Sequence, residues 1–170
     1  MRLDEIISSA IIADIDGNII EAALLYEEAT KNCGCPANVY SNLSFIYWQV
    51  TEIGFAAYYH LTDDYVKYSG ERYESLLEHG LRYFPNNSEL GFWRMYFHWY
   101  WFNDDIIEEC IKLVKTCMVP YFFLYSMSHG EQYLKEAMLL KLNCETEKTI
   151  KTKYIISIVE STCNKRKKGI

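Results

Sequence analysis

Proline and glycine are scarce in this sequence of 170 residues, which contains three prolines and eight glycines. Because proline breaks helices and glycine weakens them, the scarcity leaves room for long uninterrupted helices. No apolar run reaches the roughly 18 to 20 residues that a membrane span requires. The first residues, MRLDEII, place Asp4 and Glu5 where a secretion signal would be basic and then apolar. We therefore expect a cytoplasmic protein without membrane association.

The sequence also lacks the short motifs that identify common enzymes. It has no phosphate-binding loop, no G-x-S-x-G and no H-E-x-x-H. The four histidines are far apart, and the six cysteines show no zinc-site spacing, so we expect free thiols and no metal. Adjacent acidic residues such as Glu27 and Glu28 are expected on helix faces or in turns, not as a catalytic pair. We expect no enzymatic activity and no cofactor.

The charge is unevenly distributed along the chain. The net charge is −6, but residues 165–168 (KRKK) hold four of the 17 basic residues, so residues 1–164 carry 13 basic and 23 acidic groups. Such an acidic body repels phosphates, so nucleic acid is not an expected ligand. It favours a basic protein partner, although solubility alone also explains acidity. The basic tail, 165–170, is expected to be a frayed end.

Apolar residues recur at spacings of three and four almost throughout, which predicts an all-α fold. Turn signals such as NCGCP and FPNNS separate the helices, and Asn86 is expected to cap a helix start with Glu89 as its capping-box partner. Segments 52–62 and 120–127 are less clear. The expected helices cover residues 3–14, 18–32, 37–50, 70–84, 87–102, 104–117, 131–142 and 146–161.

A period of about 34 residues is visible in the first third of the chain. Tyr40, Leu43, Ser44 and Tyr47 lie 34 positions beyond Ile6, Ser9, Ala10 and Ala13, and small residues recur at Ala22 and Ala29. This pattern resembles the tetratricopeptide repeats. The resemblance implies antiparallel helix pairs in an irregular right-handed α-solenoid within a single domain, 1–164. The units would cover 3–36, 37–85 with an insertion near 51–67, and 86–117, followed by capping helices over 118–164.

Eight of the eleven residues from Phe92 to Phe102 are aromatic. On a helix from Leu90, the side with Trp93, Phe97 and Trp101 is expected to be core, and the opposite side is either buried as well or exposed at a concave surface. The resemblance places the first helix of each pair on that surface. Together with acidic turns that would attract a basic partner, the expected partner-binding residues are Asn38, Phe45, Trp48, Gln49, Asp63, Asp64, Met95, His98, Trp99, Asp104 and Asp105.

These features favour a chain that binds another protein. Its size, acidity and divergent repeat are similar to those of bacterial immunity proteins, which neutralise a toxin made by the same or a sibling cell. The alternative is a general adaptor or chaperone scaffold that grips a peptide in a concave groove. If the aromatic helix is buried on both sides, the binding surface is expected in the acidic turns or in the segment 51–67.

Overall fold

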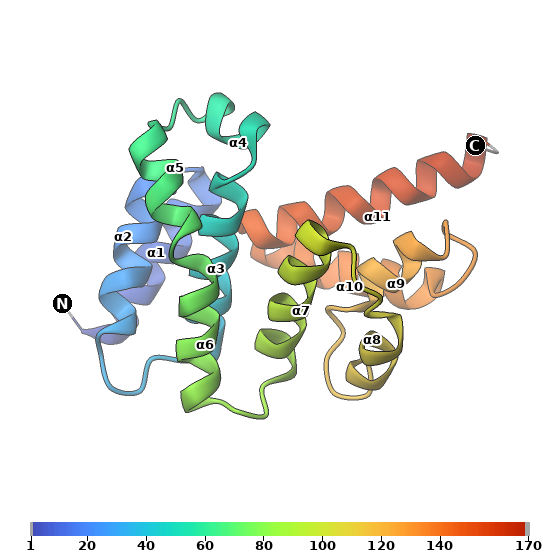
Figure 1. Cartoon of the computed structure of the whole chain (residues 1–170), viewed down its shortest axis with the longest axis horizontal. Coiled ribbons are helices and arrows are strands. Elements are labelled where there is room, and N and C mark those ends of the chain that lie inside the picture. The colour runs from blue at the N-terminus through green and yellow to red at the C-terminus, as the bar shows by residue number, and fades with distance from the viewer. Residues whose placement is uncertain (1, 169–170) are drawn as a thin grey trace. The chain divides into compact units, whose positions relative to one another are not determined.

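The computed structural model describes residues 2–168 and the side chains of residues 2–166. In this part of the chain it contains helices and no strand, which confirms the all-α prediction (Figure 1). The helices are α1 (Leu3–Asp16), α2 (Ile19–Thr30), α3 (Ala37–Val50), α4 (Ile53–Tyr58), α5 (Asp63–Gly70), α6 (Tyr73–Tyr83), α7 (Ser88–Phe102), α8 (Ile107–Leu113), α9 (Tyr121–Met127), α10 (Leu134–Glu147) and α11 (Ile150–Lys168).

Several predicted helix boundaries differ from the structure: α8 ends at Leu113, where a helix to residue 117 was predicted, and α5 was not predicted. Two further differences have local reasons. Asn87, and not Asn86, caps α7, because its side-chain oxygen accepts from the backbone N–H of Leu90 at 3.0 Å. The Glu89 carboxylate accepts from the Ser41 hydroxyl at 3.1 Å. The break between the last two helices, α10 and α11, also falls later than predicted. It lies at Lys148, which has a positive φ of 58°. Thr149 then accepts from the backbone N–H of Thr152 and starts α11.

The chain divides into two compact units, residues 1–97 and 98–170, and each is described by itself below. The division falls inside α7. The prediction of a single domain over 1–164 stays a prediction.

In unit 1, α1 and α2 form an antiparallel pair, α2 packs on α3, and α5 and α6 follow one another along α3 (Figure 1). Helix axes approach closely where small residues meet, and the small residues predicted at such crossings are fully buried. Of the glycines that the structure describes, Gly80 of α6 is in the tightest position, since an added Cβ would lie 2.9 Å from the Cβ of Tyr40 and 3.1 Å from Cδ1 of Leu90. The fully buried small residues are Ala10, Ala22, Ala29 and Ser44.

Hydrogen bonds satisfy polar side chains between the first three helices. The buried carboxylate of Asp14 in α1 accepts from the Tyr26 hydroxyl in α2 at 3.1 Å. The same hydroxyl accepts from the side-chain amide of Asn42 in α3 at 3.2 Å. A buried polar group without a partner is costly. These two hydrogen bonds therefore fix how α1, α2 and α3 pack together.

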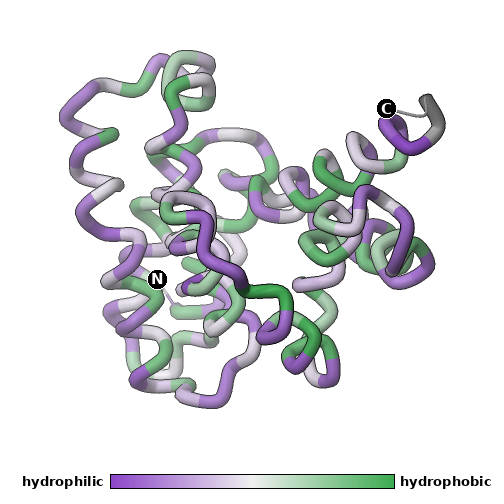
Figure 2. The backbone as a smooth tube through the Cα atoms, turned by 45° about the vertical axis from the view of Figure 1, so that its right-hand side comes forward, coloured by the Kyte–Doolittle hydropathy of each residue, from purple (hydrophilic) through white to green (hydrophobic). Residues whose placement is uncertain are grey.

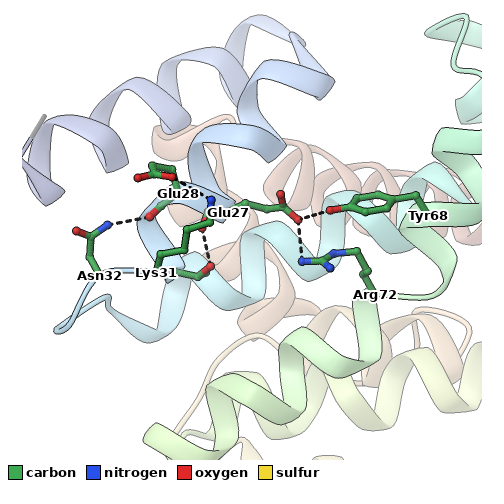
Figure 3. Close-up of polar contacts among 7 residues, drawn as sticks. Glu27, Glu28, Lys31, Asn32, Tyr68 and Arg72 are labelled. Carbon is green, nitrogen blue, oxygen red and sulfur yellow. Dashed lines mark hydrogen bonds and ion pairs between the residues drawn. The ribbon is translucent and has the colours of Figure 1, made fainter.

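The segment between α3 and α6 forms the short helices α4 and α5. Glu27 of α2 contacts the end of this segment (Figure 3). One oxygen of Glu27 accepts from the Tyr68 hydroxyl at 2.8 Å and pairs with the Arg72 guanidinium at 2.9 Å. The guanidinium carbon also lies 4.9 Å from the centre of the Tyr68 ring. Tyr47 and Tyr65 complete an aromatic cluster around this contact. Burial, with the Glu27 carboxylate nearby, raises the pKa of Tyr65 to about 12.

In unit 2, α9 packs against both α10 and α11, which contact each other. The basic end of the chain is part of α11, which extends to Lys168, so the prediction of a frayed end is wrong for residues 165–168. The Arg166 side chain packs close to Gly130, which follows α9. A Cβ added at Gly130 would lie 3.4 Å from Cδ of Arg166. Residues 169 and 170 of the predicted tail lie outside the described residues.

Hydrophobic and hydrophilic residues alternate along the helices of both units (Figure 2), as expected for helices with one buried and one exposed face. Within residues 2–168, no helix combines the length and the apolar character needed to cross a bilayer.

The contact at Gly80 predicts a strong effect of a single methyl group. Gly80→Ala is expected to lower the free energy of unfolding by about 1 to 3 kcal/mol, because the new Cβ collides with Tyr40 between two packed helices. Gly91→Ala is the matched control, since an added Cβ in α7 meets nothing within 4 Å there. It should be neutral or stabilising by up to about 1 kcal/mol. Chemical denaturation measures both, and equal effects would contradict the close approach of α3 and α6.

The Glu27 contact makes a second prediction. Glu27→Gln is expected to cost about 1 to 3 kcal/mol, because Arg72 and Tyr68 lose a charged hydrogen-bond partner whose side chain is only 15% exposed. Amide hydrogen exchange in α5 should increase at the same time. Glu28→Gln is the control, because the Glu28 side chain is 55% exposed and pairs only with Lys31 in the same helix (Figure 3). Unchanged exchange in α5 would show that Glu27 does not hold this segment.

Candidate functional site

The aromatic helix α7 changes character along its length. Trp93 and Phe97 are fully buried, whereas Trp101 is 48% and Phe102 is 65% exposed. Phe92 and Tyr96, on the side opposite Trp93, are buried as well. Over this part of the helix both sides are buried, which was one of the two alternatives, whereas the predicted core position of Trp101 is wrong. The first part of α7 is surrounded by other residues on both sides, and its last part is not.

Two of the predicted binding residues, Phe45 and Trp48, belong to the core. Both are at most 1% exposed. The Trp48 ring stacks on Phe97 with centroids 4.9 Å apart, and Phe45 meets the edge of Trp93 at the same distance. Since these rings already fill each other's contact surfaces, neither residue offers a surface to a partner in this fold. Their predicted role as anchors is replaced by a role in packing.

The remaining predicted groove residues differ in exposure. Asn38, at the start of α3, is exposed, whereas Gln49 and Met95 are half-buried. Trp99 is also half-buried, because its ring packs edge-on against Phe123 of α9 with centroids 4.8 Å apart. Trp99 is therefore held in unit 2 and presents only part of its ring.

The end of α7, the loop after it and the first turn of α8 carry what we call the aromatic–acidic surface, made of His98, Tyr100, Trp101, Phe102, Asp104, Asp105 and Glu108. All of these residues are exposed. Tyr100 and Trp101 pack edge to face with centroids 5.4 Å apart, and His98 lies against Phe102 at 4.6 Å. Several exposed aromatic side chains at the end of one helix are typical of an interaction site.

The loop that carries the acidic residues is ordered by local bonds. Asn103 adopts a positive φ of 57° and donates its backbone N–H to the carbonyl of Trp99, which ends α7. Nδ1 of His98 lies 2.8 Å from a carboxylate oxygen of Asp104. The Asp105 side chain accepts from the backbone N–H of Ile107, the first residue of α8, at 3.0 Å. The carboxylates of Asp104 and Asp105 are thus held in place before any partner arrives.

The electrostatic field of this surface is negative. Residues 95–111 include four carboxylates, Asp104, Asp105, Glu108 and Glu109, and no lysine or arginine. Lys112, which follows, lies 3.8 Å from Glu109. Because the carboxylates are exposed and only Glu109 has a lysine beside it, they are available to attract cationic groups.

The other predicted acidic turn lies in unit 1, in the first turn of α5. Asp63 and Asp64 are exposed there, behind the N-cap Thr62, where the helix dipole favours negative charge. The preceding helix α4 has no buried residue, and it displays Ile53, which is 88% exposed, and Tyr58, which is 76% exposed. Sequence reasoning did not identify these two side chains as candidates, because a short isolated helix gives no clear periodic signal.

The buried cysteines have the properties of packing residues and not of reactive groups. Burial raises the pKa of the Cys35 thiol to about 11 and that of Cys110 to about 12, so both stay protonated and poorly nucleophilic at neutral pH. Among the residues that the structure describes, histidine, cysteine and carboxylate side chains form no group of three or more suited to a metal ion.

No protein-family model matches the sequence, and no curated protein or solved structure gives a significant match. The resemblance to tetratricopeptide repeats therefore stays a prediction, and the argument for function depends on the surface just described.

Proposed function

We propose that the chain is a non-catalytic module that binds a basic protein through the aromatic–acidic surface. The observation that carries this proposal is the run of exposed rings from Tyr100 to Phe102, which are 39%, 48% and 65% exposed and are followed directly by four carboxylates. Aromatic residues supply the desolvated anchors of protein interfaces, and charges at the edge steer the partner toward them.

The charge of unit 1 supports the same type of partner. Residues 1–97 contain 14 acidic and six basic residues, so this unit has a net charge of −8. A basic protein approaching the chain is attracted over much of its surface, which speeds association without determining where it docks.

The biological role that we propose is that of a cytoplasmic immunity protein, which binds a cognate bacterial toxin and blocks it. Small size and strong acidity favour this role over the alternative, a general adaptor that holds a peptide in a concave groove. The adaptor role is also weakened by the burial of Phe45 and Trp48, which were its expected groove residues. The finer architecture that we propose for the chain is a divergent tetratricopeptide-like solenoid ending in capping helices.

The test uses the toxin domain, if one is encoded beside this gene, and the full chain. Co-expression of wild-type chain is expected to restore growth and to give a complex on gel filtration. Trp101→Ser/Phe102→Ser should weaken the complex by about 30-fold or more, which corresponds to roughly 2 kcal/mol. Its thermal melting should change little, because both side chains are exposed.

The matched control removes two equally prominent apolar side chains from unit 1, as Ile53→Ser/Tyr58→Ser. This variant should bind and restore growth like the wild type. If it loses binding and the α7 variant does not, the docking surface lies in the segment between α3 and α6. If the wild type neither restores growth nor binds, the immunity role is wrong.

A further inference from the structure

The aromatic–acidic surface combines two of the three components of an arginine site. Exposed aromatic side chains are supplied by Trp101 and Phe102, and carboxylates follow at Asp104, Asp105 and Glu108. The third component, a cation, is missing from residues 95–111. A cation is attracted both by carboxylates and by the negative face of an aromatic ring, with tryptophan the strongest of the rings.

The same three components occur together inside unit 1. There, the Arg72 guanidinium pairs with Glu27 at 2.9 Å, and its carbon lies 4.9 Å from the centre of the Tyr68 ring (Figure 3). Tyr68 in turn donates its hydroxyl to the same oxygen of Glu27. This contact shows how the chain's own chemistry holds a guanidinium between a ring and a carboxylate.

We propose, building on the protein-binding function above, that the aromatic–acidic surface recognises an arginine side chain of the partner. The guanidinium stacks on the exposed ring of Trp101 and pairs with the carboxylates of Asp105 and Glu108. Asp105 accepts from the backbone N–H of Ile107 with one oxygen and pairs with the guanidinium through the other. Asp104, which already pairs with the His98 side chain at 2.8 Å, serves as a positioning residue.

Arginine fits this surface better than lysine for physical reasons. The planar guanidinium is weakly hydrated and can stack on a ring while its N–H groups point sideways to carboxylates. A lysine ammonium is a compact, strongly hydrated charge, so stacking it costs more dehydration and gives fewer directed hydrogen bonds. If only charge mattered, the two cations would bind equally well.

The proposal is tested with two defined probes, acetylated and amidated hexa-arginine and hexa-lysine, which carry the same charge. Each peptide is titrated into the full-length chain by calorimetry at low salt. Hexa-arginine is expected to bind about 5- to 20-fold more tightly than hexa-lysine. Trp101→Leu, which keeps an apolar side chain but removes the aromatic face, should reduce this ratio to near one.

Charge variants locate the site. Asp105→Asn/Glu108→Gln should weaken both peptides several-fold, and asparagine keeps the side-chain oxygen that starts α8. Asp63→Asn/Asp64→Asn removes the same charge from unit 1 and should have a much smaller effect. Equal binding of the two peptides, an arginine preference that survives Trp101→Leu, or equal effects of the two charge variants would each overturn the proposal.

The outcome is separable from that of the proposed function. If the peptides show no arginine preference while the toxin complex still depends on Trp101 and Phe102, protein binding stands and the arginine site is wrong. If the arginine preference is found but no toxin complex forms, the surface has the proposed chemistry and the immunity role is wrong.

Discussion

Burial of α3 on nearly all sides is the constraint on which unit 1 depends. Eleven of its 14 residues are buried, so the helix needs neighbours in every direction. The chain supplies α2, α5 and α6 as neighbours, and Phe45 meets the aromatic rings of α7. Two details make this arrangement possible. Gly80 lets α6 come within contact of the Tyr40 side chain, and Tyr26 satisfies the polar group of Asn42.

The same constraint explains why α7 has two different parts. Its first part lies against rings from α3, where Trp48 stacks on Phe97 and Phe45 meets Trp93. Beyond Phe97 the helix continues with the same aromatic composition, but Tyr100, Trp101 and Phe102 are exposed. An aromatic sequence that serves stability over one stretch thus supplies a binding surface over the next. The carboxylates that follow give this surface its preference for cations.

The longer helices and the small residues at crossings were predictable, because spacing of apolar residues and turn signals are local properties of the sequence. The short helices α4, α5 and α9 were not predicted. The capping residue of α7 was misplaced by one position, since Asn86 and Asn87 are chemically equivalent candidates and only packing selects Asn87. Trp48 and Trp101 were assigned to the wrong environments. In a helix that is aromatic in every direction, periodicity cannot show which rings are covered, because the covering residues come from distant parts of the chain. The negative charge of the loop was visible in the sequence, but its pre-ordering by His98 and by the Ile107 backbone N–H was not.

The central claim is that α7 passes from core to surface within one helix, and a pair of tryptophan truncations tests it most directly. The free energy of unfolding, measured by chemical denaturation, should fall by roughly 3 to 5 kcal/mol in Trp93→Ala, whose ring is fully buried. In Trp101→Ala, which replaces a residue that is 48% exposed, it should change by about 1 kcal/mol or less. Similar losses in the two variants would show that the end of α7 is part of the core, and the binding surface placed there would then not exist.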